Sequence, residues 1–138
     1  MQKTFAMIKP CAFGRGAAPD MIRDIKEAGF SVARKAELIL TREQAEWLYR
    51  EHSERSHFSD LVDFTISGPV LIMELEFDAE GAPAAFRSLM GPTDIAKAGD
   101  DTLRGRYAED FRRNSIHGSD GDESAREELG YFASSFDT

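Results

Sequence analysis

Cysteine is nearly absent from this sequence, and long apolar runs are missing altogether. Cys11 is the single thiol among 138 residues, which excludes an internal disulfide and fits a reducing compartment. No run approaches the roughly 20 apolar residues that a membrane-spanning helix needs. Residues 1–16 contain nothing like the apolar core of a secretory signal. We therefore expect a cytoplasmic protein with no membrane partner.

Positive charge is in the minority, since 17 Lys and Arg residues stand against 25 Asp and Glu residues, giving a formal net charge of −8. Non-specific binding to nucleic acid depends on many contacts from Lys and Arg to phosphates, so this balance argues against a nucleic-acid partner. Any small anionic ligand must instead be met by a local cluster of basic side chains.

Low-complexity tracts, internal repeats and flexible linkers are missing as well. The hydrophobic fraction of 41% and the ten phenylalanines are typical of a globular protein. A chain of 138 residues is long enough for one packed core and too short for two. We therefore expect one domain over residues 1–138.

Hydrophobic periodicity predicts strands that alternate with helices along the chain. Strands are expected within residues 4–8, 30–40, 67–77 and 114–117. In the third of these, Leu71, Met73 and Leu75 are predicted to face the core, while Glu74 and Glu76 alternate outward. A glycine-bearing turn is expected after the first strand, before Pro19.

Capping residues and apolar faces predict the helices. Pro19 and Gly29 bracket the first helix, and Thr41 with Gln44 forms a capping box at the start of the next. Further helices are expected within residues 58–66, 85–90, 102–108 and 120–132. Residues 91–113 otherwise have no clear period, and loops of that length are commonly functional. The order of elements predicts a ferredoxin-like α+β sandwich, with a four-stranded antiparallel sheet covered by helices and an added C-terminal helix.

The heptapeptide NSIHGSD places one of only three histidines at the end of the fourth predicted strand. Gly118 has no side chain, so the backbone is free to turn sharply and to leave one face of the His117 ring open to a ligand. Ser119, Asp120 and Glu128 offer acceptors that would set the ring tautomer, as a nucleophilic histidine requires. A core histidine with a satisfied ring nitrogen would fit the same position.

Basic residues gather around this heptapeptide, after the first strand and through the long loop, in a chain that is otherwise acidic. Their concentration indicates an anion site. Solvated charges balanced by neighbouring Asp and Glu explain several of them equally well, and we assign Lys97 and Arg106 to that class. Lys9 and Arg104 resist this explanation, because a charge beside a buried strand or a tight turn needs a partner. The basic residues concerned are Lys9, Arg15, Arg87, Lys97, Arg104, Arg106, Arg112 and Arg113.

Several motifs follow one another over nearly the whole chain: FAMIKP, SGP at residues 67–69, TLRG at residues 102–105, and NSIHGSD with ESAREELGYF. In this combination and spacing the sequence resembles the nucleoside diphosphate kinase family. The resemblance implies ping-pong transfer of a γ-phosphoryl group, typically from ATP, to a nucleoside diphosphate through a phosphohistidine, with broad tolerance of base and sugar. One nucleotide site can then serve donor and acceptor, and positive charge on the transferred oxygens would supply much of the catalysis.

The resemblance also assigns roles to individual positions. His117 matches the nucleophile, Glu128 and Ser119 match the residues that orient it, and Lys9 matches a catalytic lysine that contacts the phosphates. The remaining substrate-binding positions are Tyr49 near the transferred group, Arg87, Thr93 and Arg104 on the phosphates, Asn114 on the sugar, and Leu61 and Phe111 beside the base. Tyr49 and Leu61 would also serve as core residues of their helices, and Asn114 as a turn cap.

His57 departs from the family pattern, because it stands where a phenylalanine usually stacks on the base. Imidazole still stacks, but with less area, so base affinity is expected to fall by about 0.5 to 1.5 kcal/mol. A protonated His57 would also make binding pH-dependent. We keep His57 among the substrate-binding residues.

The expected Mg²⁺ cofactor and the expected oligomeric state follow from the resemblance alone. Mg²⁺ in this family is carried mainly by the nucleotide phosphates and water, so no residue is assigned as a metal ligand, although Asp120 could touch the hydration shell. A homotetramer or homohexamer is implied.

Two other functions remain open. A non-catalytic oligomer of the same fold, serving to sense nucleotides or to bind a partner, is motivated by His57. A nucleic-acid-binding module is disfavoured by the charge balance and by the lack of paired aromatic strand motifs.

Overall fold

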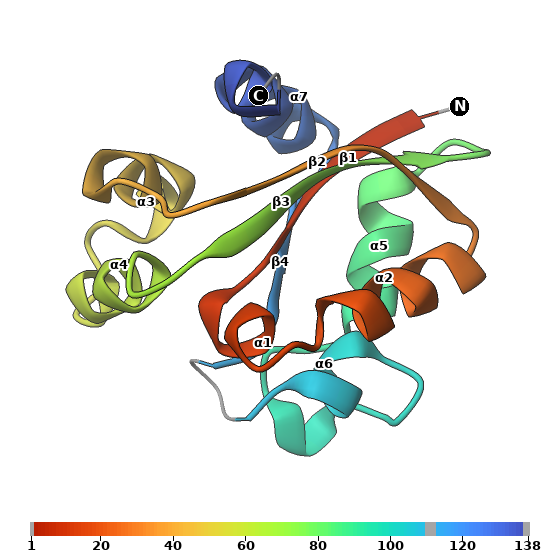
Figure 1. Ribbon diagram of the computed structural model, residues 1–138, viewed down its shortest axis with the longest axis horizontal. Helices are drawn as coiled ribbons and strands as arrows, with labels where there is room; N and C mark the ends of the chain where they lie inside the picture. Colours follow the sequence, from red (N-terminus) through yellow and green to blue (C-terminus); the bar gives the residue numbers. More distant parts are fainter. Residues whose placement is uncertain (1, 110–112, 137–138) are drawn as a thin grey trace.

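Within the part of the chain that the computed structural model describes, residues 2–109 and 113–136, four strands form one antiparallel sheet in the order β2-β3-β1-β4. The strands are β1 (Gln2–Ile8), β2 (Phe30–Leu38), β3 (Val70–Phe77) and β4 (Ile116–Gly118). Helices lie on both faces of this sheet (Figure 1). The prediction of a ferredoxin-like α+β sandwich is confirmed.

Helices connect the strands and close the chain. They are α1 (Pro10–Gly14), α2 (Ala18–Glu27), α3 (Arg42–Leu48), α4 (Phe58–Thr65), α5 (Ala82–Met90), α6 (Leu103–Tyr107) and α7 (Asp122–Tyr131), with short 3-10 helices η1 (Arg50–His52), η2 (Ile95–Lys97) and η3 (Ala133–Phe136). The predicted capping box is present. The Thr41 hydroxyl accepts a hydrogen bond from the backbone N–H of Gln44 at 3.1 Å, and the side-chain oxygen of Gln44 accepts one from the backbone N–H of Thr41 at 2.9 Å. None of the helices described is long and apolar enough to cross a membrane.

The central strand β1 is buried on both faces. Ala6 and Ile8 pack with residues of α2 and α5, whereas Phe5 and Met7 belong to a second cluster with α3 and the C-terminal helices. Successive side chains of a strand point to opposite faces, so a strand covered on both sides is a continuous apolar run. The two clusters fix β1 firmly, and with it the end of the strand at Ile8.

The prediction that Glu74 faces outward was wrong. Glu74 is only 5% exposed. Its carboxylate accepts a hydrogen bond from Arg34 at 2.8 Å and lies 3.6 Å from the Lys3 ammonium. The reason is that helices also cover the second face of β3. On this face Arg34 stacks on Phe136, with its guanidinium carbon 4.8 Å from the ring centroid.

The turn expected after the first strand begins instead with helix α1. Pro10 occupies its first turn, where a fixed φ and a missing N–H are tolerated. Lys9 is the N-cap residue, with extended backbone, and its amide donates to the Ser115 carbonyl at 2.9 Å. Lys9 is thereby held at the junction of β1, α1 and the segment that leads into β4.

Candidate active site

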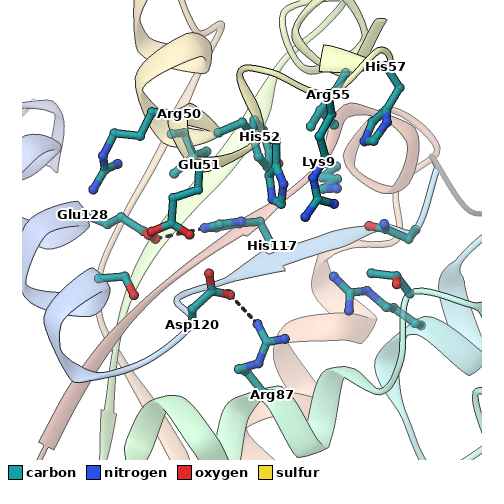
Figure 2. Close-up of a pocket in the computed structure, with 18 residues that line it drawn as sticks. Lys9, Arg50, Glu51, His52, Arg55, His57, Arg87, His117, Asp120 and Glu128 are labelled. Carbon is teal, nitrogen blue, oxygen red and sulfur yellow. Dashed lines mark hydrogen bonds and ion pairs between the residues drawn. The ribbon is translucent and has the colours of Figure 1, made fainter.

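A pocket of about 460 Å³ lies between the segment of α3, η1 and α4 and the ends of β1 and β4 (Figure 2). It is lined by nearly all the described residues that the sequence assigned to a site: Lys9, Tyr49, His57, Leu61, Arg87, Thr93, Arg104, Asn114, His117 and Glu128. Ser119 lies behind the pocket wall and does not line it. Phe111 falls outside the described residues.

The His117 ring is held by Glu128. Its Nε2 lies 2.9 Å from Glu128 Oε1, and the Ser119 hydroxyl donates to the same oxygen at 3.0 Å. Glu128 and Ser119 are 4% and 1% exposed, so both are shielded from competing water. With Glu128 ionised, its carboxylate only accepts hydrogen bonds, which places the proton on Nε2 and leaves the lone pair on Nδ1. Tyr49 and Phe5 contact the ring edge-on, at centroid distances of 5.6 and 6.0 Å.

Asp120, also offered by the sequence as an acceptor for His117, has another partner. Its carboxylate accepts from Arg87 at 2.7 Å across the mouth of the pocket (Figure 2). Both side chains are substantially exposed. This pair therefore leaves orientation of the ring to Glu128 and Ser119.

Gly118 does not make the sharp turn that the sequence suggested. It is part of β4, where it pairs with Ala6. A Cβ at Gly118 would lie 2.8 Å from Phe86 and 2.9 Å from Met90, so the glycine allows α5 to pack directly against the strand. The turn occurs earlier, at the buried Ser115. Its φ is 76°, and Ser115 is the one non-glycine residue with a positive φ among the residues described.

Lys9 and Arg104 form the positive floor of the pocket. They are 4% and 7% exposed, and among the described residues neither forms an ion pair with a carboxylate. Arg104 donates to the carbonyls of Gly91 at 2.9 Å and Ile116 at 3.0 Å. Burial, together with the charge of Arg104, lowers the pKa of Lys9 to about 7. Two buried cations that lack a counter-ion are costly unless a ligand supplies one.

Burial followed by the charge of Arg87 lowers the pKa of Arg104 to about 10. The three cations therefore act on one another across the pocket, and an anion bound between them would relieve both burial and repulsion. Thr93, at the rim, is exposed and available to a ligand.

Tyr49 serves the core and the pocket together. It is 6% exposed and packs with Phe5, Met7 and the C-terminal residues, as the core alternative predicted. It also lines the pocket, where the Lys9 ammonium lies 5.7 Å from its ring centroid. Burial raises the pKa of its hydroxyl well above the ordinary value, so Tyr49 remains a neutral hydrogen-bonding group.

Some pocket residues escaped the sequence analysis, namely Leu48, Arg50, Glu51, His52, Arg55 and Ser124. His52 has a buried Nδ1 for which the described residues provide no hydrogen-bond partner. Burial, then the charge of Arg55, lowers the pKa of His52. The spacing of three residues between Tyr49 and His52 was a usable signal, because residues so spaced share a helix face. All three histidines of the chain therefore line this pocket.

Several basic residues that the sequence gathered near the site belong elsewhere. Arg15 and Arg113 pair with Glu109, at 2.7 and 3.2 Å. Arg106, assigned to solvated charges, forms an ion pair of 3.0 Å with the buried Asp24. Lys97 is exposed and does not line the pocket. Arg112 falls outside the described residues.

Comparisons with known proteins identify the family of the chain. The family model for nucleoside diphosphate kinase matches residues 2–138. A nucleoside diphosphate kinase of Trichlorobacter lovleyi is 43% identical over 137 residues, which cover 99% of this chain and 98% of the relative. The solved structure of the Aquifex aeolicus nucleoside diphosphate kinase matches with a TM-score of 0.87 and 35% identity, over 95% and 94% of the two chains. That of the Halobacterium salinarum enzyme, in complex with CDP, matches with a TM-score of 0.88 and 34% identity, over 95% and 86%. The chain thus belongs to the nucleoside diphosphate kinase family.

Proposed function

We propose that this protein transfers the γ-phosphoryl group of a nucleoside triphosphate, typically ATP, to a nucleoside diphosphate by a ping-pong mechanism through a phosphohistidine at His117. The observation that carries the proposal is one imidazole, oriented by a buried carboxylate, in a pocket floored by two buried cations that pair with no carboxylate in the part of the chain that the structure describes. Membership of the family supports the kinase activity itself.

In the first half-reaction the lone pair on His117 Nδ1 attacks the γ-phosphorus. The bond from that phosphorus to the β–γ bridging oxygen breaks, and the nucleoside diphosphate leaves with the bonding electrons. Nδ1 is the nucleophile in this proposal because Nε2 is engaged by Glu128. In the second half-reaction a terminal oxygen of another diphosphate attacks the same phosphorus, and the N–P bond returns its electrons to the ring.

Glu128 supports both half-reactions. Phosphorylation leaves the ring positively charged, with a proton on Nε2, and the carboxylate at 2.9 Å stabilises that charge. The hydroxyl of Ser119 fixes the carboxylate in turn. Lys9, Arg104 and Arg87 would bind the phosphate oxygens, where charge accumulates in a loose transition state.

Broad tolerance of base and sugar is proposed from the character of the outer pocket. His57 and Leu61 lie one helical turn apart at the start of α4, and both line the pocket. An imidazole face and an aliphatic side chain favour stacking and apolar contact over selective hydrogen bonds. Tyr49 would lie near the transferred group and Asn114 beside the sugar hydroxyl, with Thr93 on the phosphates.

Mg²⁺ fits this pocket as a companion of the nucleotide. Asp120 lines the pocket with a side chain that is more than half exposed, so it suits a contact to the hydration shell. When bound, the ion would neutralise charge on the phosphates. Lys9, Arg87 and Arg104 would bind the oxygens that the ion leaves free.

A homotetramer or homohexamer in the cytoplasm completes the proposal. Strand β2 is an edge of the sheet, and the adjoining Ile39 is 62% exposed, so coverage by another subunit would remove a liability. The lone cysteine suits a reducing compartment. Light scattering of the purified protein tests the subunit count, and a monomer would contradict it.

Two measurements test the mechanism. Incubation with ATP labelled in the γ-phosphate should leave acid-labile, alkali-stable label on the protein, and His117→Ala should abolish both label and turnover. Conversion of GDP to GTP with ATP as donor separates the enzyme from a nucleotide-sensing homologue, which would bind without exchange. Full turnover by His117→Ala would remove the phosphohistidine from the mechanism.

A further inference from the structure

One wall of the pocket comes from a helical hairpin formed by residues 41–66, which contains α3, η1 and α4. This α3–α4 hairpin lies to one side of the sheet, away from α2, α5 and α6 (Figure 1). It supplies several pocket residues, among them Tyr49, His52 and His57. The opposite wall includes Ser124 and Glu128 of α7. The distance between the hairpin and α7 therefore determines the width of the pocket.

A group of interlocked side chains joins these two walls on the outside of the pocket. The rings of Trp47 and Tyr131 stack at 3.9 Å between centroids, with planes 5° apart. The guanidinium carbon of Arg50 lies 4.1 Å from the Trp47 ring centroid. Because Tyr131 occupies one face of the indole at this short distance, Arg50 covers the other. Arg50 also donates to the Trp47 carbonyl at 2.9 Å and to Glu127 at 3.0 Å.

These four residues come from both walls. Trp47 and Arg50 belong to the hairpin, and Glu127 and Tyr131 flank Glu128 on α7. Trp47 further contacts Phe132 edge-on at 6.2 Å, and Phe132 stacks on Phe5 at 5.1 Å. A connected series of rings thus runs from the outer surface to the residue that packs on His117.

We propose that Trp47, Arg50, Glu127 and Tyr131, here called the aromatic clamp, are positioning residues that hold the hairpin against α7 and thereby set nucleotide affinity. The proposal rests on the proposed function, because the ligand of the pocket is taken to be a nucleotide. Trp47, Glu127 and Tyr131 do not line the pocket, so they act through the pocket residues that they hold in place.

The physical basis is a change in population. With the clamp intact, Tyr49, His52 and His57 are already positioned for ligand. Without it, the hairpin spends part of its time in positions where these residues are displaced. The apparent dissociation constant then rises in inverse proportion to the competent fraction. Once nucleotide is bound, the wall is complete again and the chemical step proceeds normally.

Tyr131→Ser is the decisive variant, because Tyr131 is 36% exposed and its loss leaves the core intact. We expect the dissociation constant for ADP with Mg²⁺, and the KM, to rise roughly three- to tenfold, as for loss of an aromatic pair. The kcat at saturating nucleotide should stay within about twofold of wild type. Tyr131→Phe, which keeps the stack, should behave as wild type. Arg126→Ser is the matched control, since Arg126 is an exposed residue of the same helix that neither lines the pocket nor belongs to the clamp.

Tryptophan fluorescence supplies a readout that a purely structural role would not change. Trp47 is the single tryptophan, so all of the indole emission reports on the clamp. In Tyr131→Ser, added ADP should reduce quenching of Trp47 by acrylamide, because the ligand draws the hairpin back onto α7. In wild type the indole is already covered and the change should be small.

The outcomes separate cleanly. A raised dissociation constant with retained kcat and ligand-dependent shielding supports the clamp. Unchanged ADP binding by Tyr131→Ser, or lower thermal stability with unchanged binding, overturns it. If wild-type protein binds no ADP, the proposed function fails and the role of the clamp fails with it.

Discussion

Buried charge is treated in opposite ways in two regions of this molecule. Away from the pocket, each buried carboxylate has partners within the chain. Asp24 is 8% exposed, accepts a hydrogen bond from the Tyr107 hydroxyl at 2.5 Å and pairs with Arg106 at 3.0 Å. In the pocket, Lys9 and Arg104 are equally buried, yet neither forms an ion pair with a carboxylate of the described residues.

The pKa directions express this difference. Burial alone would raise the pKa of Asp24, but hydrogen bonds from Tyr107 and Arg106, with the charge of Arg106, hold it below the ordinary value. Glu74 behaves in the same way with Arg34 and Lys3. For Lys9, burial and a neighbouring cation both lower the pKa. The fold neutralises the charges it needs for structure, and it leaves the pocket charges to be neutralised by a ligand.

The largest effect is expected from Lys9→Met. Removing a cation that is proposed to contact the transferred phosphoryl group should lower turnover about 10²- to 10³-fold. The free energy of unfolding should stay unchanged or rise, because an unpaired buried charge is removed. An exchange assay and urea denaturation measure the two quantities. A large loss of stability would break the comparison, since Lys9 would then be a structural charge like Asp24.

Asp24→Ala should show the reverse pattern. The free energy of unfolding at neutral pH should fall by about 1 to 3 kcal/mol, because Tyr107 and Arg106 lose their common acceptor. Turnover should fall far less than in Lys9→Met. The folded pKa of Asp24 is below its unfolded value, so its stabilisation is present above the ordinary pKa of about 3.9 and is lost as the pH falls below it.

Urea titrations of wild type and Asp24→Ala between neutral pH and pH 3 follow this dependence. The difference in unfolding free energy should shrink toward the acid end. Asp24→Asn keeps an acceptor for Tyr107 and should recover part of the stability. A difference that grows on acidification would contradict the assigned charge state.

The lowered pKa of Lys9 predicts that nucleotide binding depends on pH. With a pKa of about 7 in the free protein, the lysine is neutral above that pH, and binding of a phosphate requires it to take up a proton. The dissociation constant for ADP should therefore rise by up to about tenfold per pH unit above pH 7. Calorimetry in buffers of different ionisation enthalpy measures the proton uptake directly. Lys9→Met should remove that uptake, and an uptake that survived the substitution would belong to another group.

His57→Phe should have the smallest effect and should separate the base end of the pocket from the phosphate end. The larger apolar ring is expected to tighten nucleotide binding by about 0.5 to 1.5 kcal/mol, which is roughly two- to tenfold in KM. Inorganic phosphate lacks a base, so its affinity should not change. A variant with altered phosphate affinity would place His57 among the groups that act on the charged end.

Local signals predicted most of the fold. The capping box of Thr41 and Gln44 and the period-two pattern of β2 and β3 depend on neighbours in sequence, so they can be recognised without tertiary information. Burial of Glu74 could not be predicted in this way, because Arg34 and Lys3 reach it from adjacent strands. Helix α1 is a single turn and was hidden by the glycines around it.

The residues of the candidate site could be predicted where a sequence motif contains them. The other pocket residues could not be predicted in this way. The positions matched by resemblance line one pocket, with Ser119 behind its wall and Phe111 outside the described residues. His52 ends the 3-10 helix η1 and Arg55 follows it, so their approach to the pocket depends on how the hairpin folds back. The clamp joins residues that lie far apart in the sequence, since Arg50 and Glu127 are separated by 77 positions. A pattern of local periodicity carries no trace of it.

Gly118 follows His117 directly in the sequence, but it serves the packing of helix α5 on the sheet. It has no role in the proposed chemistry, yet the methyl group of an alanine would lie within 3 Å of Phe86 and Met90, so these side chains of α5 would have to shift. Packing of α5 against β4 therefore favours glycine after the histidine, independently of any phosphoryl transfer. Of these two neighbouring residues, Gly118 serves the packing of the fold and His117 serves the proposed chemistry. A glycine at this position is therefore evidence for the fold and not for the activity.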